Sequence, residues 1–361
     1  MKLKTINGIT HIHSKDNPLH PEKTVTFEEE MTIGEKDEKG EMQLYKPSQF
    51  TVDSADNIYI SDRADQAIKI FDRNGNYQKT IGRKGEGPGE FLRISRMAFL
   101  PDGRLLVMDW RAKRTSLFNK DGEFMQSYKW QASHFDVYLT SESSYTINEF
   151  LFGVKPRLFI IIHDFSGKKL VSFGEFTPFT MKVLRLRDTT FSISFPYEPQ
   201  SIFAGDQERQ WLYHCLNDKY LIEVYNRNGK LFRKMDRPYE PVPFMRKDAE
   251  EYWLSFGENP DSVSVQMAKE VELPKIKTIT EQLLVDEQGN LWVKTFEEKI
   301  QGDRRFIAYD IFNKEGFYYA RVWSSVSPGL FKGRKMYSMV EDKDTGICTL
   351  KCYRVIWKDK E

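Results

Sequence analysis

The stretch that decides the fold runs from Val52 to Gly82 and reads VDSADNIYISD at 52–62, IKIFDRNGNY at 68–77 and TIG at 80–82. It consists of short runs of β-forming residues separated by turns rich in Asp, Asn and Gly, which is the chemistry of tight β-hairpins. The same pattern returns from Met97 to Phe124, and the hairpin glycines Gly75 and Gly122 are 47 positions apart. A period of this length, with four strands per unit, is typical of one blade of a β-propeller.

Further copies of the unit follow along the chain, at 145–167, 211–229, 283–317 and 335–357. The last copy has three strands only, whereas the TIG at 32–34 repeats the TIG that ends the first full unit. We therefore expect the segment at about 25–34 to supply the missing outer strand and close the ring, which removes exposed sheet edges. The prediction is an all-β, six-bladed β-propeller in a single domain over 1–361, with an N-terminal tail at 1–24 and blades at about 47–357.

One segment departs from the repeat, between the fourth and fifth blades at about 245–272. Residues Lys247–Gly257 combine helix formers with a terminating glycine, and Asp261–Val271 follows a proline and indicates a second, shorter helix. We expect a small helical insertion in the crossover between these two blades.

The first unit also resembles a known repeat. Residues 56–62 (DNIYISD), 68–71 (IKIF) and 82–91 (GRKGEGPGEF) look like an NHL repeat, and the chain resembles the bacterial six-bladed β-propellers of NHL type, most clearly over 45–130. Most members of that family have no assigned activity. Members usually carry a secretion or lipoprotein signal, so the resemblance implies an extracytoplasmic location, periplasmic or at the cell surface. The sequence itself shows no apolar signal segment behind its first lysines.

The composition argues against several classes of partner. The chain has 54 Lys+Arg and 53 Asp+Glu, so a net charge of +1 gives no long-range field for a polyanion, and no basic stripe is visible in the sequence. The longest aliphatic or aromatic run, Leu158–Ile162, is far short of the ~20 residues of a membrane span. The glycines at 82–89 lack the Gly-Lys-Ser/Thr and the helix of a phosphate loop. We therefore expect no nucleic-acid partner and no membrane span.

Candidate binding residues gather in the loops of one face. Counting strands a to d from the centre of a propeller outward, the b-to-c loops and d-to-a crossovers open together around the channel mouth. These loops and the helical insertion carry Arg63, Trp110, Arg111, Lys113, Arg114, Tyr252 and Trp253. Such residues can hold an anionic or planar ligand by bidentate hydrogen bonds and cation–π contacts. The alternatives are that the arginines pair with Asp62, Asp65 and Asp109 in solvated loops, and that the two insertion aromatics dock the helices on the ring.

Asp62 and Asp109 occupy the same position of successive repeats. Repetition across blades indicates a structural role, in which the carboxylate accepts backbone N–H groups of the turn, because catalysis needs unlike residues that converge once. Glu149 and His214 fall near that position in the third and fourth blades.

Metal chemistry is the main alternative to binding alone. Some six-bladed propellers are metal-dependent lactonases or lyases, but no spacing here brings three of the 6 histidines together. The segment Asp342–Gly346 lacks the later glutamate and flanking helices of a calcium loop, and no nucleophile motif is present. We predict no cofactor and a non-enzymatic scaffold that presents its loop rim to a protein, peptide or glycan. The alternative is a metal-dependent hydrolase or lyase with a divalent ion in the channel.

Overall fold

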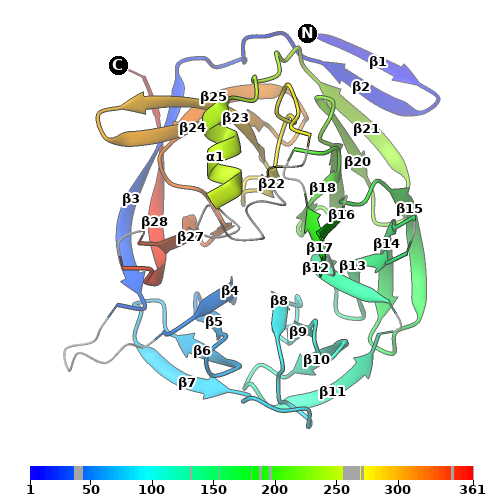
Figure 1. Ribbon diagram of the computed structural model, residues 1–361, viewed down its shortest axis with the longest axis vertical. Helices are drawn as coiled ribbons and strands as arrows, with labels where there is room; N and C mark the ends of the chain where they lie inside the picture. The colour runs from blue at the N-terminus through cyan, green and yellow to red at the C-terminus, as the bar shows by residue number, and fades with distance from the viewer. Residues whose placement is uncertain are drawn as a thin grey trace.

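Six antiparallel blades surround a central axis, each built on four strands (Figure 1). This computed structural model describes residues 1–35, 44–130, 132–153, 155–179, 181–186, 189–194, 197–254, 269, 272–342 and 345–360. The six-bladed, all-β architecture expected from the repeat is confirmed.

Each of the first three blades is built from four strands that are consecutive in the sequence. Blade 1 consists of β4 (Pro47–Val52), β5 (Ile58–Asp62), β6 (Ala67–Phe71) and β7 (Tyr77–Ile81). Blade 2 consists of β8 (Ile94–Phe99), β9 (Leu105–Asp109), β10 (Arg114–Phe118) and β11 (Phe124–Lys129). Blade 3 consists of β12 (Ser133–Thr140), β13 (Ser144–Leu151), β14 (Arg157–Asp164) and β15 (Lys169–Phe176).

The other three blades complete the ring, and the N-terminal region contributes to two of them. Blade 4 consists of β18 (Ser201–Asp206), β19 (Trp211–Leu216), β20 (Leu221–Tyr225) and β21 (Leu231–Asp236). Blade 5 consists of β22 (Gln282–Val285), β23 (Leu291–Gln301), β24 (Arg304–Phe312) and β25 (Tyr318–Ser324). Blade 6 consists of β26 (Leu330–Lys332), β27 (Lys335–Glu341), β28 (Cys348–Asp359) and β3 (Lys23–Ile33).

The N-terminal strand closes the ring as expected. Strand β3 pairs antiparallel with β28, from Lys23 opposite Asp359 to Ile33 opposite Leu350. On β3, Val25 belongs to the apolar cluster that also contains Trp292 of blade 5. The outer strand of blade 6 therefore comes from the other end of the chain.

The residues before β3, expected as a tail, form further structure. Strands β1 (Lys2–Ile6) and β2 (Ile9–His13) make a hairpin, and β2 runs parallel to β21 at the outer edge of blade 4. The chain then passes blade 5, where the N–H groups of Leu19 and His20 donate to carbonyls of β25. Residues 1–33 thus follow the outside of blades 4, 5 and 6, and we call them the N-terminal strap.

Turn chemistry and burial explain why the strands begin and end where they do. In the turn between β6 and β7, the Asp72 carboxylate accepts the N–H groups of Asn74 and Asn76, and Gly75 has a φ of 86°. A Cβ on Gly75 would lie 2.7 Å from the sulfur of Met31, so glycine is required there. Strands β5, β6, β9 and β10 are buried along their whole lengths, because neighbouring blades cover both faces of each sheet.

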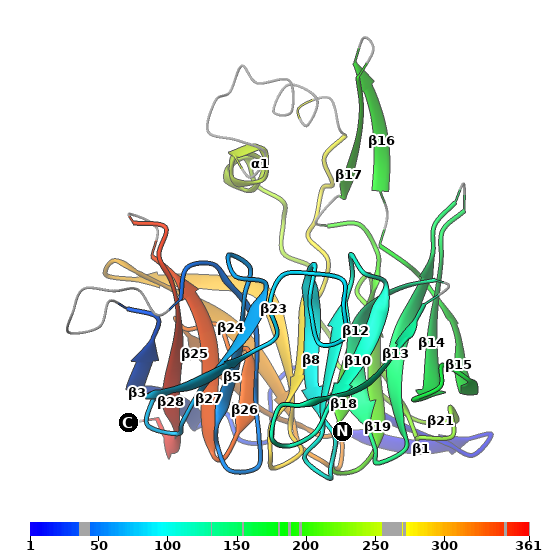
Figure 2. The same cartoon turned by 90° about the horizontal axis from the view of Figure 1, so that it is seen from below.

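Two insertions rise from the same face of the ring (Figure 2). Helix α1 (Arg246–Leu254) lies in the crossover from blade 4 to blade 5, inside the expected helical insertion. The second expected helix, Asp261–Val271, lies outside the described residues apart from Lys269. A hairpin of β16 (Met181–Leu186) and β17 (Thr189–Ser194) in the crossover from blade 3 to blade 4 was not anticipated from the sequence. We call this face, with its b-to-c loops and crossovers, the rim face.

Candidate functional site

Exposed apolar side chains are distributed unevenly between the two faces of the ring. Among the described residues, those that lie away from the outermost strands and the N-terminal strap are all on the rim face. They are Tyr45, Trp110, Leu151, Phe152, Met245, Ile276 and Ile300. Within the same described part of the chain, the turns of the opposite face carry no exposed large apolar residue. A concentration of this kind is typical of an interaction surface.

The Asp62 carboxylate holds the blade 1 end of the rim together. It accepts the backbone N–H groups of Tyr45 at 2.8 Å, Lys46 at 3.0 Å and Ala64 at 3.0 Å. Burial on its own would raise the pKa of Asp62, but these donors outweigh it and lower the pKa. The side chain therefore stays ionised and fixes the crossover and the b-to-c loop in one arrangement.

Asp109 does the same in blade 2. Its carboxylate accepts the N–H groups of Leu92 at 2.6 Å, Arg93 at 3.0 Å and Ala112 at 2.9 Å, and the side chain is buried. The structural role inferred from the repeated aspartates is therefore confirmed for both. In blade 3, the amide oxygen of Asn148 accepts two backbone N–H groups in the same manner.

The expected alternative, in which the loop arginines pair with these aspartates, is not found among the described residues. Lys69 takes that place, with its Nζ 3.4 Å from Asp62 and 2.8 Å from Asp65. Arg63 and Arg111 are exposed, and neither contacts a described carboxylate. Their charges face solvent on the rim.

Trp110 lies on the rim beside these cations. Its side chain is 38% exposed, and the guanidinium of Arg93 lies 5.5 Å from the ring centroid. An arginine placed over an indole in this way keeps its charge accessible while it covers part of the ring. The b-to-c loop of blade 2 therefore offers an aromatic face and a cation together.

Arg114 has a different environment from the one expected of a ligand-binding residue. It is 7% exposed, and its guanidinium donates to the carbonyl oxygens of Glu86 at 2.7 Å and Gly87 at 3.0 Å, and to that of Glu90. These carbonyls belong to the glycine-rich crossover between blades 1 and 2. Arg114 therefore holds the crossover in place from a buried position. The exposed cations of the same loop are Arg111 and Lys113.

A cluster of aromatic rings covers the rim end of blade 3. Phe150 packs against Phe152 with centroids 4.5 Å apart and against Phe179 at 4.7 Å, and Phe135 lies edge-on to Phe150 at 5.9 Å. Phe152 is nevertheless 57% exposed, and Leu151 beside it is also exposed. The packed rings thus support Leu151 and Phe152, whose apolar side chains are exposed on the surface.

The two aromatic residues expected on the insertion lie on α1. Tyr252 is 8% exposed, and burial raises its pKa to about 12. Trp253 is half-buried. The structure does not bring them together with Trp110, which lies in a loop of blade 2.

A cavity of about 290 Å³ lies beneath α1, between the crossover and blade 5. Phe296 and Trp323 supply aromatic walls, and Lys277 and Asp248 supply a buried ion pair with a 2.7 Å separation. Glu298 at its edge pairs with Lys247 and Arg305. The b-to-c segment of blade 5, at 297–305, is the tip of the long β23–β24 hairpin, which forms one side of this cavity.

A buried charge network supports the floor of that region. Asp310 is fully buried between Arg237, at 2.6 Å, and Arg321, at 2.7 Å, and it accepts the hydroxyl groups of Tyr220 and Tyr318. Burial opposes ionisation, but the two guanidiniums outweigh it and lower the pKa of Asp310. The network joins blade 4 to blade 5 through fully paired charges.

The channel itself contains a paired cation. The guanidinium of Arg96 on β8 makes a bidentate contact with Asp136 on β12, at 2.7 and 2.6 Å, and also donates to Gln49 on β4. Within the described residues, no group of three or more His, Cys, Asp or Glu side chains is placed to hold a metal ion. His214 contacts Glu223 and Ser201, and Glu149 contacts Lys169.

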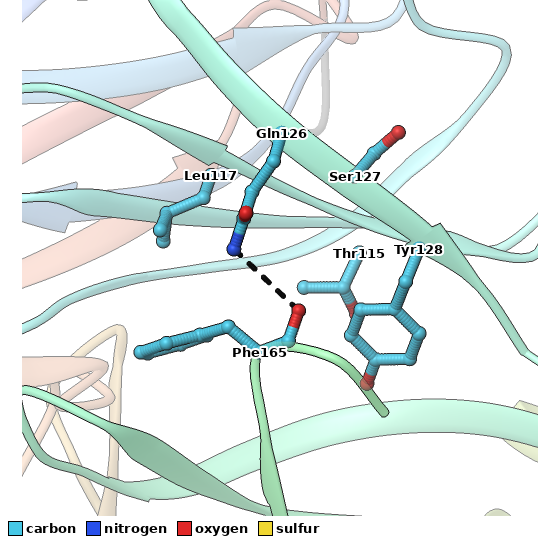
Figure 3. A pocket seen from close by; sticks show the side chains of 6 residues that line it. All are labelled: Thr115, Leu117, Gln126, Ser127, Tyr128 and Phe165. Carbon is cyan, nitrogen blue, oxygen red and sulfur yellow. Dashed lines mark hydrogen bonds between the residues drawn. The ribbon is translucent and has the colours of Figure 1, made fainter. Parts of the chain in front are cut away.

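A second hollow, between the outer part of blade 2 and a turn of blade 3, is too small for a ligand (Figure 3). It measures about 10 Å³ and is lined by Thr115, Tyr128 and Phe165, with Gln126 donating to the Phe165 carbonyl at 3.5 Å. This volume leaves room for about one water molecule at most.

Comparison with known proteins agrees with this architecture. A family model described as a 6-bladed beta-propeller (DUF5128) matches residues 39–99. The fold is a six-bladed β-propeller. The narrower assignment to the NHL type stays a prediction. A search of curated proteins gives no match.

Similar solved structures include two from Bacteroides. One is a protein of Bacteroides fragilis described as a candidate exported protein, with 11% identity and a TM-score of 0.53 over 97% of this chain and 100% of that one. The other is a member of the DUF4221 family from Bacteroides vulgatus, with 11% identity and a TM-score of 0.57 over 93% of this chain and 99% of that one. At this level of identity the likeness concerns the fold alone. In the part of the chain that the structure describes, no helix is long and apolar enough to cross a membrane.

Several rim residues were not found from the sequence. Arg93 belongs to a crossover and comes close to Trp110 only because Asp109 fixes that crossover. Leu151 and Phe152 are exposed on the rim, but nothing in the sequence separated them from core residues. Both faces of β13 are buried up to Phe150, so no alternation along the strand marks Leu151 as the first exposed residue.

Proposed function

We propose that this protein is a non-enzymatic binding scaffold whose rim face captures a macromolecular partner. The observation that carries the proposal is that the described exposed apolar residues outside the outer strands and the N-terminal strap all lie on the rim face, and none lies in the described turns of the opposite face. The two insertions rise from this same face and enlarge it (Figure 2). Large Trp, Tyr and Phe side chains on a rigid frame are typical anchors of binding surfaces.

We further propose an extracytoplasmic location. The support is the resemblance to exported bacterial propellers, together with the likeness in fold to the Bacteroides fragilis protein. Fractionation of cells with a tagged chain tests this directly, and recovery of the protein only with the cytosol would contradict it.

Binding by the rim is tested by capture with the immobilised chain from an extract of its own organism. The double variant Trp110→Ala/Arg111→Ala should lose the captured partner and keep the melting temperature, since both side chains are exposed and surface changes usually alter stability by ~0.5 kcal/mol or less. The matched control is Arg73→Ala/Lys120→Ala, in turns of the opposite face, which should capture as before. Equal capture by all three proteins would show that the rim is not the binding face.

A second measurement addresses the enzyme alternative. Elemental analysis of the purified protein should be combined with a melt in the presence and absence of chelator. A divalent ion at about one per chain, with a chelator-sensitive melting temperature, would favour a metal-dependent hydrolase or lyase.

A further inference from the structure

One sector of the rim face, over blades 1 to 3, carries a set of exposed cations that no described carboxylate neutralises. They come from the b-to-c loops, the crossovers and the rim end of β11. They are Lys46, Arg63, Lys84, Arg93, Arg111, Lys113, Lys129 and Lys155. We call this set the basic rim.

The basic rim remains after local pairing is taken into account. Arg83 pairs with Glu90 and Arg157 with Glu175, so these cations are not part of it. The exposed carboxylates of the sector that stand outside described ion pairs are Glu35 and Glu86. Among the described residues of the sector, exposed cations outside ion pairs therefore outnumber such carboxylates, although the whole chain has a net charge of +1.

The rest of the surface does not repeat this imbalance. In the turns of the opposite face, charges of both signs are adjacent, as in Asp72-Arg73 and Lys120-Asp121. On the half of the rim that carries α1, some described cations are paired, as Arg246 is with Glu250, and the exposed charges outside described ion pairs are of both signs, as in Asp218-Lys219 and Asp303-Arg304. The charge asymmetry among the described residues thus belongs to the rim face over blades 1 to 3, on the side of the ring away from α1.

Apolar points stand among these cations. Phe152 and Leu151 project from blade 3, and Trp110 and Tyr45 lie on blades 2 and 1. A partner that is only anionic would leave Leu151 and Phe152 without a contact. An acidic protein segment that also carries apolar side chains satisfies both features, since charged groups steer the encounter and apolar anchors supply affinity.

The shape of the rim face supports a protein segment over a flat membrane. The β16–β17 hairpin stands well above the ring, and α1 stands above most of its loop ends (Figure 2). A planar surface parallel to the ring would meet these insertions before it reached the loops of blades 1 to 3. An extended segment of a partner protein can instead lie on the loops of blades 1 to 3, beside the insertions.

We infer that the basic rim binds an acidic protein segment with interspersed apolar residues. This inference rests on the proposed function, since it names the partner class of the same face. The aspartates that fix the loops, Asp62 and Asp109, and the buried Arg114 hold the surface in a preformed arrangement, which lowers the entropy loss on binding.

Two labelled synthetic peptides of equal length and charge test the inference by fluorescence anisotropy. One repeats Glu-Leu-Glu-Gly and the other repeats Glu-Ser-Glu-Gly, and sulfated heparin and vesicles of phosphatidylglycerol with phosphatidylcholine serve as competing probes. The test variant is Arg93→Glu/Arg111→Glu/Lys113→Glu. Its matched control reverses exposed cations of the opposite face, Arg73→Glu/Lys120→Glu/Lys230→Glu.

The leucine peptide should bind at low salt, more tightly than the serine peptide, and less tightly as salt is added. The rim reversal should weaken it by about tenfold or more, whereas the control should change it by less than about twofold. In Leu151→Ser/Phe152→Ser, the two peptides should bind alike.

Three results would overturn the inference: no binding of either peptide, equal loss in both reversal variants, or tighter binding of heparin or vesicles with no preference for leucine. If the Trp110→Ala/Arg111→Ala variant still loses its captured partner in these cases, the proposed function stands and only the partner class is wrong.

Discussion

The imidazole of His134 is buried beside two other titratable groups. It is 2% exposed, packs at a tilt against Trp130 with 4.6 Å between ring centroids, and meets His163 edge-on at 5.6 Å. Burial lowers the pKa of His134 to about 3, and the charges of His163 and Lys169 act in the same direction. Glu149, which faces His163 and pairs with Lys169, is the adjacent carboxylate.

This shift predicts a loss of stability in acid. Above pH 6.5 His134 is neutral in both states, so its contribution is fully present. As the pH falls from about 6.5 towards 3, the unfolded imidazole takes up a proton and the folded one does not, which lowers the free energy of unfolding by about 3 kcal/mol at pH 4.5. In His134→Phe this part of the loss should vanish in urea unfolding between pH 7 and 4.5, whereas His20→Phe, at an exposed site, should keep it. An unchanged pH dependence in His134→Phe would contradict the assignment.

Residue roles were predictable where one position repeats between blades. Asp62 and Asp109 are equivalent by sequence, and the repeated need for a turn acceptor identifies their role. Arg114 could not be assigned in this way, because its partners are backbone carbonyls of a distant crossover. Every residue has a backbone carbonyl, so a contact between an arginine side chain and a carbonyl requires no particular residue type at the acceptor position. The sequence therefore does not indicate such a contact.

At the scale of elements, turn residues predicted most blade boundaries but not the β16–β17 hairpin. That hairpin is an insertion in a crossover, so it has no counterpart in the repeat, and its strands lack an Asn-Gly or Asp-Gly turn between them. Helix α1 was found because its start and stop signals are local.

Helix α1 is held on the ring largely by Asp248. One carboxylate oxygen accepts the N–H of Met245 at 2.7 Å, and the other lies 2.7 Å from Lys277 Nζ, with both side chains almost fully buried. In Asp248→Asn the buried lysine loses its partner, at a cost of about 3 kcal/mol, so α1 should open more often. Hydrogen exchange over Arg246–Leu254 should then rise by about tenfold or more, with the blades unchanged.

The control for α1 is Arg246→Gln, which removes an ion pair whose arginine side chain is 91% exposed. Exposed pairs of this kind contribute little, so exchange should stay near that of the parent protein. A faster exchange that spread through blade 5 in Asp248→Asn would instead show that the ion pair stabilises the ring.

At the scale of the whole molecule, the six-bladed ring was predictable and the basic rim only in part, through Arg63, Arg111 and Lys113. The number of blades follows from the spacing of the four-strand repeat, which persists even in copies that have little sequence similarity to the first one. The other cations of the basic rim, such as Lys46, Lys84 and Arg93, come from separate crossovers and strand ends, so neither the net charge of +1 nor the stretch at 110–114 alone gives the full set. Only the closed ring places these loops side by side on one face.

Ring closure itself depends on β3 and not on the hairpin before it. Deletion of residues 1–20 removes β1 and β2 from the edge of blade 4 but leaves β3 paired with β28, so the melting transition should stay cooperative with a modest decrease. Deletion of residues 1–34 exposes the β28 edge and uncovers the apolar cluster around Trp292, so the protein should aggregate or melt much earlier. A synthetic peptide of residues 21–35, added to the shorter chain, should restore part of the transition, because it can pair with β28 in trans. Scanning calorimetry and size-exclusion chromatography would measure both effects, and equal stability of the two truncated chains would show that the last blade is stable with three strands.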